Sequence, residues 1–160
     1  DQDEKRLLFE LSQMSNPNHL RLTKLALTTG FRRSELLSLT WRNIDLKKRV
    51  IYIHRKNCAA IDDSSVLRLV PLPEKAEKIL EESNERNGKV IELSKGAARN
   101  GFDKARKRAG LQTLRFHDLR HIAISRMWSS GMNALEISAC SGHRDIKMLM
   151  RYSHYELSLL

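Results

Sequence analysis

The hydrophobic pattern of this chain changes period between residues 44 and 70, and this change constrains the fold more than any other feature. Mostly apolar residues at 44–46 and 50–54 flank a basic turn at 47–49, a pattern typical of a β-hairpin. Residues 66–70 are again mostly apolar and end at Pro71, which predicts a third strand. The pattern therefore predicts one small antiparallel sheet of three strands.

Helical periodicity governs the rest of the chain. Apolar residues recur there at three- and four-residue intervals, and Gly30 is expected to end the second helix in a sharp turn. The predicted helices cover residues 4–14, 18–28, 33–40, 74–86, 95–109, 117–130, 133–141 and 145–152. The fold class is therefore α+β, mainly α-helical. No linker rich in Pro, Gly or Ser divides residues 1–160, so we expect a single domain.

Charge indicates the kind of partner. The chain has 29 Lys and Arg against 19 Asp and Glu, a formal net charge of +10. Such an excess favours a polyanion such as nucleic acid, since each neutralised phosphate releases counterions. Cys58 and Cys140 have no metal-ligand spacing and are interpreted as free thiols. With an acidic N-terminus and no long apolar stretch, they indicate a cytoplasmic protein.

Two separated segments carry arginines that could bind phosphate. Residues 29–36 read TGFRRSEL, so Arg32 or Arg33 stands at the start of a helix, where backbone donors favour an anion. Helix geometry would direct one of the two towards a buried phosphate. Residues 117–121 read HDLRH, which places His117 and Arg120 on one helix face. Each segment alone also fits a solvated surface.

The remaining candidates lie near the C-terminus. His143 follows Gly142 where a loop enters the last predicted helix, and its ring either donates to a phosphate or fills a gap in the core. Tyr152 follows nine residues later and is a candidate nucleophile, although a terminal aromatic residue also fits core packing. His121 either joins the face of His117 or packs beneath it.

The ordered set of motifs resembles the catalytic domain of the tyrosine recombinases, the phage-integrase family. The resemblance runs from about residue 5 to 155 and takes in the segments at 29–36, 117–121, 141–143 and 151–154. It identifies Arg32, rather than Arg33, as the arginine of the first motif. Lys56, between the second and third strands, resembles the lysine of the family's β-hairpin.

This resemblance implies DNA breakage and rejoining. Tyr152 would attack the scissile phosphate to give a 3′-phosphotyrosyl enzyme, while Arg32, Arg120 and His143 would hold the non-bridging oxygens. Lys56 would protonate the leaving 5′-oxygen, and His117 would help to deprotonate Tyr152. The resemblance implies no cofactor and no metal. It implies double-stranded DNA as partner and self-association on DNA, with a tetrameric synapse in the full-length protein.

The chain departs from the family pattern at several points. Ser141 replaces the usual leucine before Gly142, an exchange expected to loosen packing under His143. The stretch from Cys58 to Ser65 replaces a short turn, and the family's N-terminal core-binding domain is absent. We therefore expect an excised catalytic domain, or else a naturally short protein. A type IB topoisomerase-like enzyme, a non-catalytic DNA-binding relative and a protein-interaction module remain alternatives.

Overall fold

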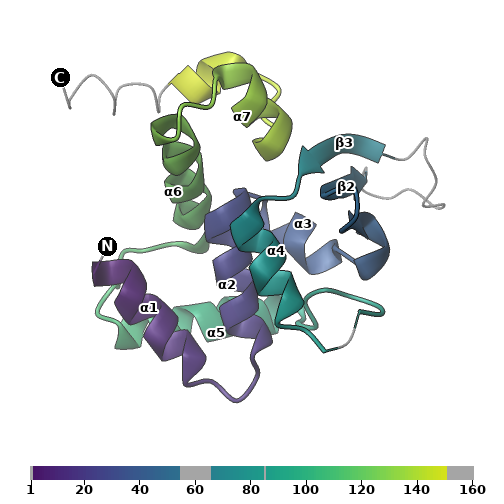
Figure 1. The fold of residues 1–160 in the computed structure, drawn as a ribbon. Coiled ribbons are helices and arrows are strands. Elements are labelled where there is room, and N and C mark those ends of the chain that lie inside the picture. The colour runs from purple at the N-terminus through teal and green to yellow at the C-terminus, as the bar shows by residue number, and fades with distance from the viewer. Residues whose placement is uncertain (1, 55–65, 85, 151–160) are drawn as a thin grey trace.

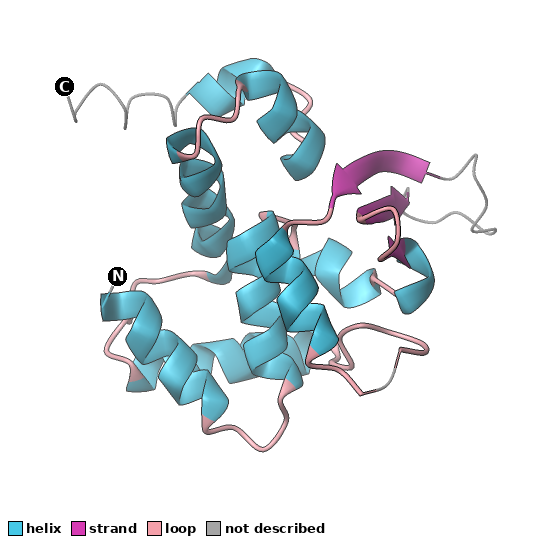
Figure 2. Ribbon diagram, in the orientation of Figure 1, coloured by secondary structure: helices cyan, strands magenta, loops and turns pink. Residues whose placement is uncertain are grey.

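The computed structural model describes residues 2–54, 66–84 and 86–150, and it confirms the predicted α+β fold with one three-stranded antiparallel sheet (Figures 1 and 2). The helices are α1 (Gln2–Ser12), α2 (Asn18–Thr29), α3 (Arg33–Ser38), α4 (Glu74–Glu81), α5 (Lys95–Arg108), α6 (Phe116–Ser129) and α7 (Ala134–Ser141). A 3₁₀ turn, η1 (Trp41–Asn43), precedes the strands β1 (Ile44–Asp45), β2 (Val50–His54) and β3 (Val66–Pro71). Residues 146–150 are also helical.

Helix α2 lies at the centre of the molecule and packs against α1, α3, α4, α5 and α6 (Figure 1). It can do so because its apolar side chains are distributed around much of its circumference, and Leu22, Leu25 and Ala26 are almost fully buried. Leu7 and Leu11 of α1 belong to the same hydrophobic core. Within the described part of the chain, no helix is long and apolar enough to cross a bilayer.

The sheet is a meander in which β2 is the central strand. Ile51 of β2 pairs with Ile44 on one side and with Val70 on the other, and the register shifts between Ile53 and His54. Because Ile51 and Val70 are each only 1% exposed, one face of the sheet belongs to the core. Strand β3 also contacts α7, so the sheet is joined directly to the C-terminal half of the chain.

The turn after α2 forms as the sequence predicts. Gly30 adopts a left-handed conformation with φ of 66°, and its N–H donates to the carbonyl oxygen of Ala26 at 3.0 Å. Glycine reaches this region without the steric cost that a Cβ imposes. The turn reverses the chain and brings Arg32 to the start of α3.

Three helices end earlier than the sequence predicts. Helix α1 ends at Ser12 rather than near residue 14, and α3 and α4 also end early. Helix α3 ends at Ser38 instead of near residue 40, since Leu39 accepts a hydrogen bond from the N–H of Val90 at 3.0 Å. Thr40 then forms an isolated antiparallel bridge with Lys89. Helix α4 ends at Glu81 rather than near residue 86. The Val90–Leu39 hydrogen bond and the Thr40–Lys89 bridge pair the segment after α4 with the segment after α3. Sequence periodicity does not reveal this pairing.

Candidate active site

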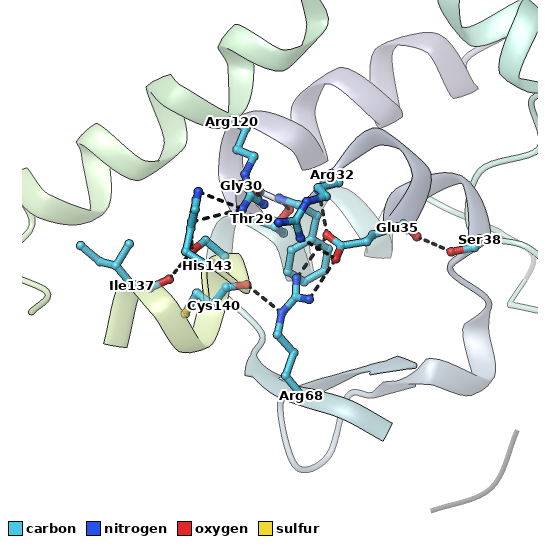
Figure 3. Close-up of polar contacts among 12 residues, drawn as sticks. Thr29, Gly30, Arg32, Glu35, Ser38, Arg68, Arg120, Ile137, Cys140 and His143 are labelled. Carbon is cyan, nitrogen blue, oxygen red and sulfur yellow. Dashed lines mark hydrogen bonds and ion pairs between the residues drawn. The ribbon is translucent and has the colours of Figure 1, made fainter. Parts of the chain in front are cut away.

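Arg120 is the buried centre of a cluster of cationic side chains (Figure 3). It lies on α6 with 3% of its surface exposed, and its Nη1 donates to the carbonyl oxygen of Gly30 at 2.6 Å. Burying a guanidinium group is costly unless its donors are bonded. This bond therefore both fixes the orientation of the guanidinium and joins α6 to the turn that precedes α3.

The imidazole of His143 lies against Arg120. Nη2 of Arg120 is 3.2 Å from Nδ1 and 3.4 Å from Nε2 of the ring. Gly142, with φ of 71°, ends α7 immediately before this histidine. Burial, followed by the positive charges of Arg120 and Arg32, lowers the pKa of His143 to about 4. The ring is therefore neutral near pH 7 in the protein without DNA.

Arg32 and its neighbour Arg33 point to different surroundings. The N–H of Arg32 donates to Oε2 of Glu35 at 2.8 Å, and its Nη1 lies 3.4 Å from Oε1 of the same carboxylate. The guanidinium of Arg33 instead lies 5.7 Å from the centre of the Phe116 ring. Figure 3 shows Arg32 beside Arg120 and near His143. Of the two arginines that the sequence offered, Arg32 is the one at the cluster.

An ion pair between Glu35 and Arg68 lies next to Arg32 of the cluster. This ion pair was not predicted from the sequence. Nη1 and Nη2 of Arg68, on β3, donate to the two carboxylate oxygens of Glu35 at 2.9 and 3.2 Å. Nε of Arg68 donates to the carbonyl oxygen of Cys140 at 3.3 Å, and its guanidinium lies 5.4 Å from the Phe31 ring centre. One side chain thereby connects β3, α3 and α7.

The pKa of Glu35 reflects this position. Burial alone would raise it, but hydrogen bonds and charge from Arg68, together with Arg32, hold the pKa of this carboxyl below its usual value. Glu35 is therefore ionised near neutral pH and orients both arginines. The sequence signals for this pair were an arginine within an apolar strand and an acid three residues after Arg32.

His117 and His121 lie together on α6. Their rings meet edge to face, with centroids 4.9 Å apart, so His121 joins the face of His117 rather than packing beneath it. Partial desolvation, followed by the charges of His121 and Arg120, lowers the pKa of His117. His117 is thus neutral near pH 7 and can accept a proton.

Two of the predicted site residues, Lys56 and Tyr152, lie outside the residues that the structure describes. The structure brings the other four candidates into one region: Arg32, His117, Arg120 and His143. These side chains come from the start of α3, from α6 and from the segment after α7. Two guanidinium groups and an imidazole directed at one place are suited to bind an anion such as phosphate.

Comparison with protein families gives a match over nearly the whole chain. The model described as "Phage integrase family" matches residues 1–157. The shufflon-specific DNA recombinase of Escherichia coli is 38% identical over 133 residues, which cover 81% of this chain and 33% of the recombinase. The integrase of Salmonella phage P22 is 29% identical over 147 residues, which cover 83% of this chain and 38% of the integrase. The chain thus spans well under half of either relative.

Solved structures show the same fold. The catalytic domain of bacteriophage HP1 integrase superposes with a TM-score of 0.75 and 26% identity, covering 97% of this chain and 85% of that domain. The Tn1549 transposon integrase, solved in complex with circular intermediate DNA, superposes with a TM-score of 0.70 and 23% identity. It covers 93% of this chain and 58% of that one. The HP1 domain thus matches this chain over most of the length of both.

Proposed function

Because the chain belongs to the phage integrase family, we propose that residues 1–160 form the catalytic domain of a site-specific DNA recombinase from a phage, prophage or other mobile element. It breaks and rejoins double-stranded DNA through a 3′-phosphotyrosyl intermediate on Tyr152. The observation that carries the proposal is the meeting of Arg32, Arg120 and His143 from three separate segments. The names of the relatives, recombinase and integrase, support it.

The cluster stabilises charge on the reacting phosphate. Oη of Tyr152 attacks phosphorus, a new P–O bond forms, and the bond from phosphorus to the 5′-oxygen breaks. Arg32 and Arg120 bind the non-bridging oxygens, on which negative charge grows in the transition state. His143 contributes a third contact beside Arg120. Because the phosphotyrosine keeps the energy of the phosphodiester, the 5′-hydroxyl of another strand can reverse the reaction.

Two proton transfers accompany the displacement. The phenol of Tyr152 has an ordinary pKa of about 10, so it must lose its proton as it attacks. His117 takes that proton, and its lowered pKa supports the role because the neutral ring has a free acceptor. Lys56 gives a proton to the leaving 5′-oxygen. The chemistry is supplied by side chains without a metal or a cofactor.

The biological setting is part of the proposal. Recombination exchanges strands between two DNA sites, so the full-length protein assembles on DNA as a tetramer. The net charge of +10 supports binding to the DNA backbone. The free thiol of Cys140 supports a reducing compartment, and we place the protein in the cytoplasm with its substrate.

Trapping a covalent protein–DNA adduct tests this function. A nicked substrate, built from the ends of the source element or from a randomised library, loses a short fragment after cleavage and so prevents rejoining. We expect an adduct without added metal, and mass spectrometry should locate it on Tyr152. The Tyr152→Phe variant should bind the same DNA and form no adduct.

Three results would speak against the proposal. Adducts that persist in Tyr152→Phe would exclude Tyr152 as the nucleophile. DNA binding without an adduct, also in a longer chain that includes any flanking domains, would favour a non-catalytic binding protein. Relaxation of supercoiled DNA without exchange between two sites would favour a topoisomerase-like enzyme.

A further inference from the structure

The hydroxyl of Ser141 lies between a backbone carbonyl and the ring of His143. Ser141 is fully buried, with 0% of its surface exposed. Its Oγ is 2.6 Å from the carbonyl oxygen of Ile137 and 2.7 Å from Nδ1 of His143. The serine was expected to loosen the packing beneath the histidine. The serine takes part in a short hydrogen bond with the ring, which the usual leucine could not do.

These two distances determine which atom carries each proton. A serine hydroxyl has one proton to donate, and a carbonyl oxygen can only accept. If the hydroxyl donated to Nδ1, two acceptor oxygens would face each other at 2.6 Å without a proton between them. The hydroxyl therefore donates to Ile137, and Nδ1 of His143 must be the donor to Oγ.

We propose that Ser141 is a positioning residue that holds His143 as the tautomer with its proton on Nδ1, which leaves Nε2 as the nitrogen that meets the bound phosphate. Nη2 of Arg120 lies 3.2 Å from Nδ1 and 3.4 Å from Nε2, so these distances alone do not select a nitrogen. In the proposed tautomer the Nδ1 proton points to Oγ of Ser141, and only Nε2 has a lone pair with which to accept from Arg120. A phosphate oxygen also only accepts, so Nε2 must gain a proton before it can donate to one. Phosphate binding is therefore coupled to proton uptake by His143.

The charges around the ring agree with this coupling. Arg120 faces it from α6 and Arg32 faces it from the start of α3, and both oppose a positive charge on the ring. His117 and His121, also on α6, oppose that charge only when they are themselves protonated. On the far side, Arg68 is already paired with Glu35. A phosphate between the arginines supplies the negative charge that makes the second proton favourable. Without Ser141, the neutral ring could move its proton to Nε2 and donate without taking up another.

Proton–nitrogen correlation spectra of the isotope-labelled 160-residue chain test the tautomer directly. His143→Gln identifies the signals of this ring among those of the six histidines. Near neutral pH we expect a protonated Nδ1 and a bare Nε2 in the wild type. Ser141→Ala should shift the population towards the Nε2–H form, and Ser141→Thr, which keeps the hydroxyl, should restore the wild-type pattern. A wild-type ring protonated on Nε2, or an unchanged tautomer in a folded Ser141→Ala, would overturn the inference.

The pH dependence of adduct formation gives a second readout, which rests on the proposed function. In the wild type, the rate should fall with rising pH, by at most about tenfold per pH unit for one proton. Ser141→Ala should weaken this decrease of the rate with pH, and Ser141→Thr should keep it. Equal slopes of rate against pH in all three proteins would refute the coupling. If neither this chain nor a longer chain that includes any flanking domains forms an adduct at any pH, the proposed function fails, while the spectra still decide the tautomer.

Discussion

At the residue scale, the guanidinium of Arg120 makes two contacts that need its planar shape. Nη1 bonds the Gly30 carbonyl while Nη2 lies against His143. A lysine ammonium is a single point of charge, and it cannot hold both positions and a phosphate oxygen together. We therefore expect Arg120→Lys to slow adduct formation by about a hundredfold or more, the usual cost of losing one aligned donor in a transition state.

Arg33→Lys is the matched control, because Arg33 is adjacent to the cluster in sequence but lies over Phe116. The rate of adduct formation should be close to that of the wild type. Circular dichroism of both variants establishes that they fold. Cleavage by Arg120→Lys at the wild-type rate would remove Arg120 from the reaction.

The sequence predicted which residues belong together better than it predicted their contacts. The order of motifs pointed to Arg32, Arg120 and His143, and these side chains meet in space. The hydrogen bond between Ser141 and His143 could not be predicted, because it depends on where a buried hydroxyl sits to within a fraction of an ångström. A serine in place of an apolar residue indicates only a change of packing until its partners are known.

At the scale of secondary-structure elements, the pair of Glu35 and Arg68 couples β3 to α3. Their side chains are 11% and 9% exposed, so removing one charge leaves the other buried without its partner. Glu35→Gln should lower the free energy of unfolding by about 3 kcal/mol, a typical cost of breaking a buried pair. The double variant, with Arg68→Met added to Glu35→Gln, should recover part of the lost free energy of unfolding. Chemical denaturation of the wild type and the two variants measures this, and a double variant as unstable as Glu35→Gln would argue against the pairing.

The same pair predicts a pH dependence of stability. The pKa of Glu35 is lowered in the folded protein, so its contribution is complete above the usual value of 4.5 and is lost as pH falls through the lower folded pKa. The unfolding free energy of the wild type should therefore decrease in that acidic range, and that of Glu35→Gln should depend less on pH there. The same pH dependence in both proteins would mean that the carboxylate is not stabilised by Arg68.

The helices and strands were largely predictable, and the exceptions have a common cause. The hairpin and the Gly30 turn follow from local sequence, since their turn residues and hydrophobic period act over a few positions. The end of α3 depends on Val90, about fifty residues away, which bonds the carbonyl of Leu39. The link from Arg68 to Glu35 spans 33 residues of sequence. Periodicity carries no information on such pairings.

At the scale of the whole molecule, the net charge of +10 should make DNA binding depend strongly on salt. Each phosphate that the protein neutralises releases condensed counterions, so the logarithm of the affinity falls linearly with the logarithm of salt concentration. Removing one phosphate-binding cation should reduce that slope by about one unit. Binding measured over a salt series can therefore separate cations that touch the backbone from cations that only add charge.

Arg32→Gln and Arg126→Gln apply this test, because each removes one positive charge. Arg32 is 44% exposed beside Arg120, whereas Arg126 contacts Glu4 of α1. If the cluster binds the scissile phosphate, Arg32→Gln should reduce the salt slope by about one unit, and Arg126→Gln should leave it unchanged. Equal slopes in the two variants would mean that Arg32 adds only to the overall positive charge and does not contact a phosphate. A reduced slope confined to Arg32→Gln would place a DNA phosphate at the same cluster where the adduct is expected to form.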